Sequence, residues 1–149
     1  MDTKRLAQFG FLAVLVIVAV IGILSLFNRS SRQPGVAVST GTFTMRPYNV
    51  TNDTWRVRSS RANGYSRVYY IFDETDLATM HVNSRNATGS IHLTFTQGDL
   101  ERTVDISNEY YGYIDLSGFE PGEVRLRLEF EDAVQINITI SWGEDNIFR

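Results

Sequence analysis

Cysteine is absent from the 149-residue chain, and histidine is scarce, with only His81 and His92. Without cysteine there is no disulfide, no thiolate metal site, no lipid attached to a cysteine and no cysteine nucleophile. The two histidines lie beside apolar strand residues, and no residues near them have the spacing of metal ligands. The net charge of −3 is not that of a nucleic-acid-binding protein. We therefore expect no metal, no cofactor and no nucleic-acid partner.

Charge is also missing from one long run near the N-terminus, the 22 residues Leu6–Phe27. At about 1.5 Å per residue, a helix of that length crosses the roughly 30 Å hydrocarbon core of a bilayer. A cleaved signal peptide is the alternative, but its apolar part is typically about 7–15 residues and is followed by small residues. Here the run ends in Leu26-Phe27-Asn28-Arg29. We predict an uncleaved, single-pass transmembrane helix whose partner is the lipid bilayer.

The basic residues that flank this run do not decide its orientation, because two precede it (Lys4 and Arg5) and two follow it (Arg29 and Arg32). The remainder of the chain has the pattern of an all-β surface module. For that reason we predict that the protein lies in the cell membrane with its C-terminal domain on the extracytoplasmic side.

The chain is accordingly divided into a tail (1–5), a transmembrane helix (6–27), a linker (28–39) and a folded domain (40–149). Pro34 and Gly35 in the linker prevent the helix from continuing. The domain has ten basic residues, all of them arginine, and 16 acidic residues, which give it a net charge of −6. A domain of that charge is not drawn to anionic lipids by its overall field.

Alternation of apolar and polar residues dominates the domain and is clearest in Val124–Phe130 and Val134–Trp142. Glu131-Asp132-Ala133 between them has the length of a hairpin loop. Two further strands are predicted at Ile91–Phe95 and Leu100–Ile106. Weaker alternation predicts five more, namely Gly41–Met45, Trp55–Ser59, Val68–Phe72, Met80–Ser84 and Tyr111–Leu116. Turns are expected at Asn63-Gly64, Gln97-Gly98-Asp99, Gly89 and Glu120-Pro121-Gly122.

The single helix expected in this domain is Asp73–Met80, with Asp73 or Thr75 as its N-cap. The acidic residues at its start lack the pattern of a calcium-binding loop, so we interpret them as part of the cap. About nine strands and one short helix predict an all-β fold. An antiparallel β-sandwich of jelly-roll or immunoglobulin-like type is its natural packing.

The stretch Tyr113–Leu128 (YIDLSGFEPGEVRLRL), followed by a hairpin that ends in Ile140-Ser141-Trp142, resembles the closing strands of carbohydrate-binding-type β-sandwiches. Together with the predicted anchor, the chain is similar to small, uncharacterised, single-span membrane-anchored β-sandwich proteins of Gram-positive bacteria. The resemblance covers about a third of the domain, and it implies a binding function. No ligand-contacting residue is carried over from it.

A candidate ligand site lies between Asp53 and Asp73, a segment with several arginines and no acidic residue. Its proposed members combine fixed donors with flat aromatic faces, and they are Arg56, Arg58, Tyr65, Tyr69 and Tyr70. They belong to a larger aromatic group that also contains Trp55, Phe72, Tyr110, Tyr111 and Tyr113. Two alternatives stay open: the aromatic residues pack in the core, and the arginines pair with the acidic residues between Glu120 and Asp145.

Five N-x-[ST] triplets occur, at Asn28, Asn49, Asn52, Asn86 and Asn137. Polar strand faces produce such triplets, as at Asn137, and we interpret most of the five as incidental. The chain contains no G-x-S-x-G, no H-E-x-x-H and no glycine-rich phosphate loop, so no catalytic residue is proposed.

The first functional hypothesis is therefore a non-enzymatic, extracytoplasmic binding module for a cell-surface glycan or a protein partner. A pilin-like structural subunit is the second, because Gly10-Phe11 and Val18–Leu24 resemble a processed pilin N-terminus. Pilins usually have Glu at the position of Leu15. A cell-envelope enzyme or enzyme accessory is the third.

Overall fold

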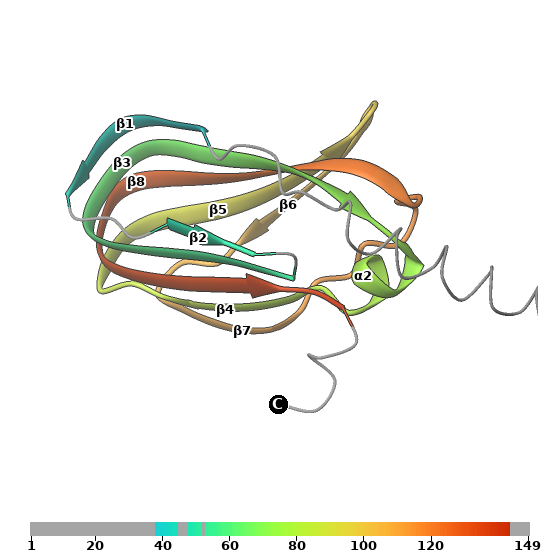
Figure 1. Ribbon diagram of the computed structural model, residues 1–149. Helices are drawn as coiled ribbons and strands as arrows, with labels where there is room; N and C mark the ends of the chain where they lie inside the picture. The colour runs from blue at the N-terminus through green and yellow to red at the C-terminus, as the bar shows by residue number, and fades with distance from the viewer. Residues whose placement is uncertain (1–37, 45–47, 52, 144–149) are drawn as a thin grey trace, which may run out of the picture. The chain divides into compact units, whose positions relative to one another are not determined.

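The computed structural model describes residues 38–44, 48–51 and 53–143, which form antiparallel strands and one short helix (Figure 1). The strands are β1 (Val38–Thr44), β2 (Tyr48–Val50), β3 (Thr54–Phe72), β4 (His81–Arg85), β5 (Thr88–Gln97), β6 (Leu100–Asp105), β7 (Glu109–Tyr113) and β8 (Gly122–Ser141). The helix is α2 (Glu74–Ala78), between β3 and β4. Every strand pair in this part of the chain is antiparallel, so the predicted all-β class is confirmed.

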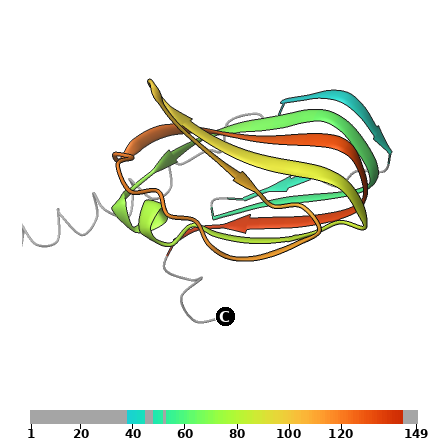
Figure 2. The same ribbon diagram turned by 180° about the vertical axis from the view of Figure 1, so that it is seen from behind.

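Two long strands, β3 and β8, form the frame of the fold. They pair along almost their whole lengths, from Thr54 opposite Ser141 to Phe72 opposite Gly122. The first half of β3 and the second half of β8 lie in the order β2-β3-β8-β4-β7, and the other two halves lie in the order β1-β3-β8-β5-β6. Figures 1 and 2 show these groups as two layers, named here the β4–β7 layer and the β5–β6 layer. Each layer has an inner face toward the other layer and an outer face.

Strand β3 bends where it passes from one layer to the other. The register shifts between Ala62 and Gly64, and the small Ala62 is paired with Ala133 of β8. Gly64 has a φ of +122° and lies opposite Gly41 of β1. A Cβ on Gly64 would be 2.2 Å from the carbonyl oxygen of Thr40, so only glycine fits at this close approach.

The bends correct two turns predicted from the sequence. Asn63-Gly64 lies inside β3 and Glu131-Asp132-Ala133 lies inside β8, so neither segment reverses the chain. In β8 the bend contains two residues with left-handed backbone, Asp132 at φ 48° and Gln135 at φ 55°. Such irregularities shift the alternation of buried and exposed residues much as a hairpin does. The sequence pattern alone therefore does not distinguish one bent strand from two paired strands.

The core lies between the inner faces of the two layers. In β8 the buried residues alternate as predicted on each side of the bend: Val124, Leu126, Leu128 and Phe130, then Ile136, Ile138 and Ile140. Val134, predicted to share the inner face, is half-buried, and Ala133 is buried at the bend instead. Trp142, directly after β8, packs with Tyr70 and Phe72 of β3 at ring-centroid distances of 4.6 and 5.2 Å. The ring of Tyr70 is 1% exposed, so this tyrosine belongs to the core.

Helix α2 begins as the sequence predicted, although it ends two residues earlier. Asp73 is the N-cap, and its Oδ1 accepts a hydrogen bond from the backbone N–H of Asp76 at 2.9 Å. In return the Oδ2 of Asp76 accepts from the backbone N–H of Asp73 at 3.0 Å. This reciprocal capping box uses Asp73 and Asp76, and Glu74 is the third acidic residue of the segment, in the first turn of the helix.

Two strands differ from the prediction, and one predicted segment lies outside the described residues. The short strand β2 was not predicted, and β7 begins two residues before the predicted Tyr111–Leu116 and ends at Tyr113. The predicted transmembrane segment, Leu6–Phe27, lies outside the residues that the structure describes. Within residues 38–44, 48–51 and 53–143, no helix is long and apolar enough to cross a membrane.

Candidate ligand-binding surface

The five residues of the predicted site do not form one patch. Arg56 and Arg58 are exposed on the outer face of the β4–β7 layer. Tyr65 and Tyr69 follow the bend of β3 and are half-buried on the outer face of the β5–β6 layer. Tyr70 lies in the core, and its predicted contribution to a surface site is wrong. The segment is separated in this way because β3 passes from one layer to the other at Ala62–Gly64.

Tyr65 is already covered by a protein side chain. The guanidinium carbon of Arg127 lies 4.5 Å from the centroid of the Tyr65 ring. Arg127 is held there by an ion pair with Glu129, in which Nη2 and Oε1 are 2.5 Å apart. A ligand that stacked on this face of Tyr65 would have to displace a cation–π contact and disturb the ion pair.

The alternative hypothesis paired Arg56 and Arg58 with acidic residues between Glu120 and Asp145. It is confirmed only in that the two segments lie side by side. The segment does lie beside β8, but the register places Arg56 opposite Thr139 and Arg58 opposite Asn137. The Nε of Arg58 donates to the Oδ1 of Asn137 at 3.3 Å. Within the described part of the chain, no carboxylate forms an ion pair with either arginine. Their charges are therefore available at the surface.

Two rows of side chains cross the outer face of the β4–β7 layer beside these arginines. Paired residues on neighbouring strands project from the same face, so each row is continuous across four strands. From β3 to β7, the first row is Arg56, Thr139, Asn83 and Tyr111. The second row is Thr54, Ser141, His81 and Tyr113. Together with Gly112, these eight residues line a depression of about 520 Å³.

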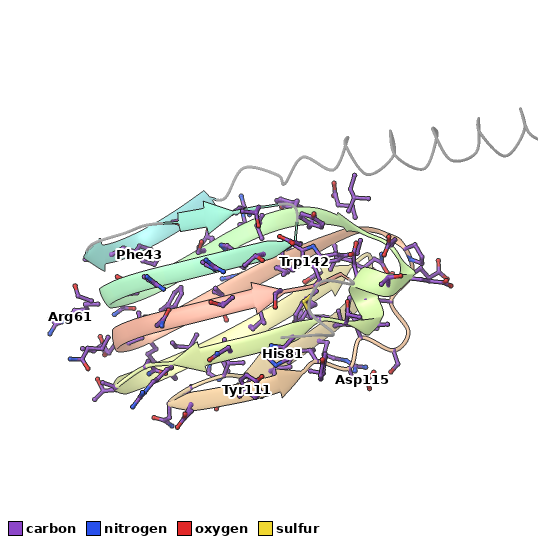
Figure 3. All side chains as sticks on the ribbon, turned by 60° about the horizontal axis from the view of Figure 1, so that its bottom comes forward. Phe43, Arg61, His81, Tyr111, Asp115 and Trp142 are labelled. Carbon is purple, nitrogen blue, oxygen red and sulfur yellow. The ribbon has the colours of Figure 1, made fainter. Side chains whose placement is uncertain are left out.

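The two tyrosines form the edge of this surface on β7. Tyr111 is 71% exposed and Tyr113 is 59% exposed. The ring of His81 on β4 packs against the rings of both tyrosines. The ring centroid of His81 lies 4.6 Å from that of Tyr111 and 5.1 Å from that of Tyr113, in edge-to-face geometry. Figure 3 shows His81 and Tyr111 next to each other on the adjacent strands. Partial burial between the tyrosines lowers the pKa of His81.

The surface combines aromatic area with many hydrogen-bonding groups. It offers the guanidinium of Arg56, the amide of Asn83, the imidazole of His81 and several hydroxyl groups. Of the residues that the structure describes, no three His, Asp or Glu side chains are grouped as they would be around a metal ion. This composition suits recognition of a polar ligand that has some apolar surface.

Sequence reasoning included Tyr111 and Tyr113 in the aromatic group but not among the proposed site residues. The sequence did indicate that an aromatic residue is exposed on this strand. Adjacent residues of a strand project from opposite faces, so one of Tyr110 and Tyr111 had to face outward. Tyr110 is indeed half-buried against the core. That Tyr111 lies in the same row as Arg56 could not be read from the sequence, because β8 and β4 separate the two residues.

The geometry of this surface is the main guide to function, since neither family models nor curated sequences provide one. No family model matches the chain, and no curated protein sequence matches it.

Proposed function

We propose that this domain is a non-enzymatic binding module that holds a glycan on the outer face of the β4–β7 layer. The observation that carries the proposal is the exposure of Tyr111 and Tyr113 beside polar side chains in the same rows. A sugar ring has an apolar face bordered by hydroxyl groups. An exposed aromatic ring with hydrogen-bonding neighbours complements both parts.

The strand order supports a jelly roll as the finer description of the fold. Strands β3 and β8 each contribute to both layers, and the consecutive strands β4 and β5, and likewise β6 and β7, are divided between the layers. Two interleaved four-stranded sheets of this kind, β3-β8-β4-β7 and β3-β8-β5-β6, are typical of jelly rolls, which include many lectin domains. Immunoglobulin-like domains divide their seven strands differently. The order also agrees with the resemblance to carbohydrate-binding sandwiches.

The proposal includes membrane attachment. The apolar segment Leu6–Phe27 has the length and composition of a bilayer span, and a short linker follows it. On this proposal the module is held within a few nanometres of the outer face of a cell membrane, where surface glycans are within reach.

A glycan-array experiment tests the binding function. The full-length chain in detergent is compared with Tyr111→Ala and Tyr113→Ala, and Tyr69→Ala on the other outer face serves as the matched control. We expect each of the first two variants to weaken binding at least about tenfold, as for aromatic hot-spot residues, and the control to bind normally. Unchanged melting temperatures would show that the folded domain is intact.

The other outcomes distinguish the remaining hypotheses. Loss of binding in Tyr69→Ala alone would move the site to the β5–β6 layer. If the array gives no ligand, while Tyr111→Ala abolishes capture of a purified cell-surface protein, the module binds protein and the glycan proposal is wrong.

A further inference from the structure

A third row of side chains adds positive charge to the same surface. Next to the row that contains Arg56 and Tyr111, the register aligns Arg58, Asn137, Arg85 and Glu109 across the four strands. Arg56, Arg58 and Arg85 are all exposed on this outer face. We call these three residues the arginine group. Arg85 is the diagonal neighbour of Tyr111, which is within reach of a long side chain.

Within residues 38–44, 48–51 and 53–143, no carboxylate forms an ion pair with the arginine group. The two ion pairs found among the described residues are Arg102–Asp115 and Arg127–Glu129, and neither contains a member of this group. Glu109 is opposite Arg85 in register but forms no ion pair with it. The domain as a whole carries a net charge of −6. Three arginines without an ion pair among the described residues make the electrostatic potential over this face positive, opposite in sign to the charge of the domain.

The opposite outer face has a different electrostatic character. Arg125 and Arg127 line a depression of about 360 Å³ there, but Glu101 and Glu129 line it too. Arg127 is paired with Glu129, and the Nη2 of Arg125 donates to the Oγ1 of Thr96 at 3.2 Å. Arg125 and Arg127 thus share their depression with two carboxylates, and Arg127 is ion-paired to one of them. Among the described residues, no member of the arginine group forms an ion pair, and Arg58 donates one hydrogen bond to the neutral side chain of Asn137.

We infer that the ligand of the β4–β7 face is an acidic polysaccharide chain whose sugar rings carry carboxylate groups. The inference rests on the proposed function and names its ligand class. Carboxylates fit the planar fork of Arg56, Arg58 and Arg85, while Tyr111 and Tyr113 contact the rings. A polyol phosphate would supply the charge but no ring to stack on the tyrosines.

The dimensions of the surface require an oligomer rather than a single sugar. Arg56 on β3 and Tyr111 on β7 are separated by β8 and β4. Three intervals between strands of about 4.8 Å each place the two ends of the row roughly 14 Å apart. A monosaccharide cannot reach both ends, but a chain of several sugars can.

The test measures binding of uronate oligosaccharides by the full-length chain in detergent. Hexamers and dimers prepared from pectate, alginate and hyaluronan are each compared with their methyl esters, which keep the rings and remove the charge. We expect at least one acidic hexamer to bind about tenfold more tightly than both its ester and the corresponding dimer. Increased salt should weaken that binding.

Variants then assign the charge to residues. Arg58→Gln and Arg85→Gln should each reduce the preference for the acid over the ester about two- to threefold, since three arginines share it. Arg61→Gln is the matched control, since Arg61 is exposed at the bend of β3, away from His81 and Tyr111 (Figure 3). Equal binding of acid and ester would overturn the inference but leave a glycan-binding function intact. Binding of only neutral or phosphate-bearing glycans on the array would do the same, and binding of no glycan at all would overturn both.

Discussion

At the scale of single residues, Asn86 has the sequence of a glycosylation acceptor but the contacts of a structural residue. Its side chain is 5% exposed. The Nδ2 atom donates to the carbonyl oxygens of Thr88 at 2.8 Å and Gly89 at 3.0 Å, and the Oδ1 atom accepts from the backbone N–H of Asn108 at 2.7 Å. Asn86 thereby ties the β4–β5 connection to the start of β7. The amide that glycosylation would modify is already in use, in agreement with its interpretation as incidental.

Replacement of Asn86 by Ala should destabilise the domain by about 2 kcal/mol or more, because it leaves buried backbone groups without partners. Asn137→Ala is the control: Asn137 is exposed and contacts Arg58 at the surface, so its loss should cost no more than about 0.5 kcal/mol. Urea unfolding of the two variants measures both values. Equally small effects would show that the Asn86 contacts contribute little to stability.

The burial of His81 predicts the sign of a pH dependence in the stability of the domain. Burial lowers the pKa of His81 below its ordinary value of 6.5, so the unfolded chain binds a proton at a higher pH than the folded chain does. The stability associated with neutral His81 is therefore complete above pH 6.5 and decreases as the pH falls toward the pKa of the folded state.

We expect the urea midpoint of the wild type to fall between pH 7.5 and pH 5.5, and to fall less in His81→Gln. His92→Gln serves as the control, since His92 lies on the outer face of the β5–β6 layer. If His81→Gln and the wild type have the same pH dependence, the burial of His81 is not coupled to folding. A direct titration of His81 by NMR would give its pKa in the folded state.

At the scale of elements, alternation predicted which residues of β8 are buried but not that β8 is one strand. Val124–Phe130 and Ile136–Ile140 have the predicted inward residues. The connection between them depends on positive φ angles at Asp132 and Gln135, which the sequence does not specify. The same holds for β3, where Gly64 was interpreted as a turn residue. Its actual role, a close approach to Gly41, depends on a partner 23 residues earlier in the chain.

Truncation of Ile138 tests the orientation of the second half of β8. Ile138 is fully buried, whereas Thr139 is half-buried on the outer face. Ile138→Ala should cost about 2–5 kcal/mol of unfolding free energy because it opens a cavity in the core, and Thr139→Ala should cost less than about 1 kcal/mol. Chemical denaturation of both variants gives the comparison. Small, equal effects would indicate a register shifted by one residue.

At the scale of the whole molecule, the candidate surface is a product of strand order. The sequence predicted a site that combines arginine and tyrosine, and Arg56 is exposed on the outer face of the β4–β7 layer. Its tyrosine neighbours, however, come from β7 rather than from β3 itself. Pairing between strands that are distant in the sequence is decided by packing of the entire core, so no local pattern contains it. The nearby tyrosines Tyr65 and Tyr69 were separated from Arg56 by the bend of β3.

The placement of the module in the cell gives the last prediction. If Leu6–Phe27 spans a bilayer, the full chain should sediment with membranes, resist extraction by carbonate and be released by detergent. A chain that begins at Pro34, and so keeps all of β1, should remain soluble because it lacks the apolar segment. Replacing Val14 and Val18 by Arg is a sharper test than deletion. Two charges at the centre of a span cost about 5–7 kcal/mol of insertion free energy, and we expect the variant to leave the membrane fraction.

Orientation is decided by protease added to intact cells. With the domain on the extracytoplasmic side, digestion should remove an epitope placed after Arg149, while a cytoplasmic marker protein stays intact. An epitope that is protected in intact cells and digested after lysis would place the domain in the cytoplasm. The arginine group and the exposed tyrosines would then face no surface polysaccharide, so this single result would also remove the physical setting on which the proposed ligand depends.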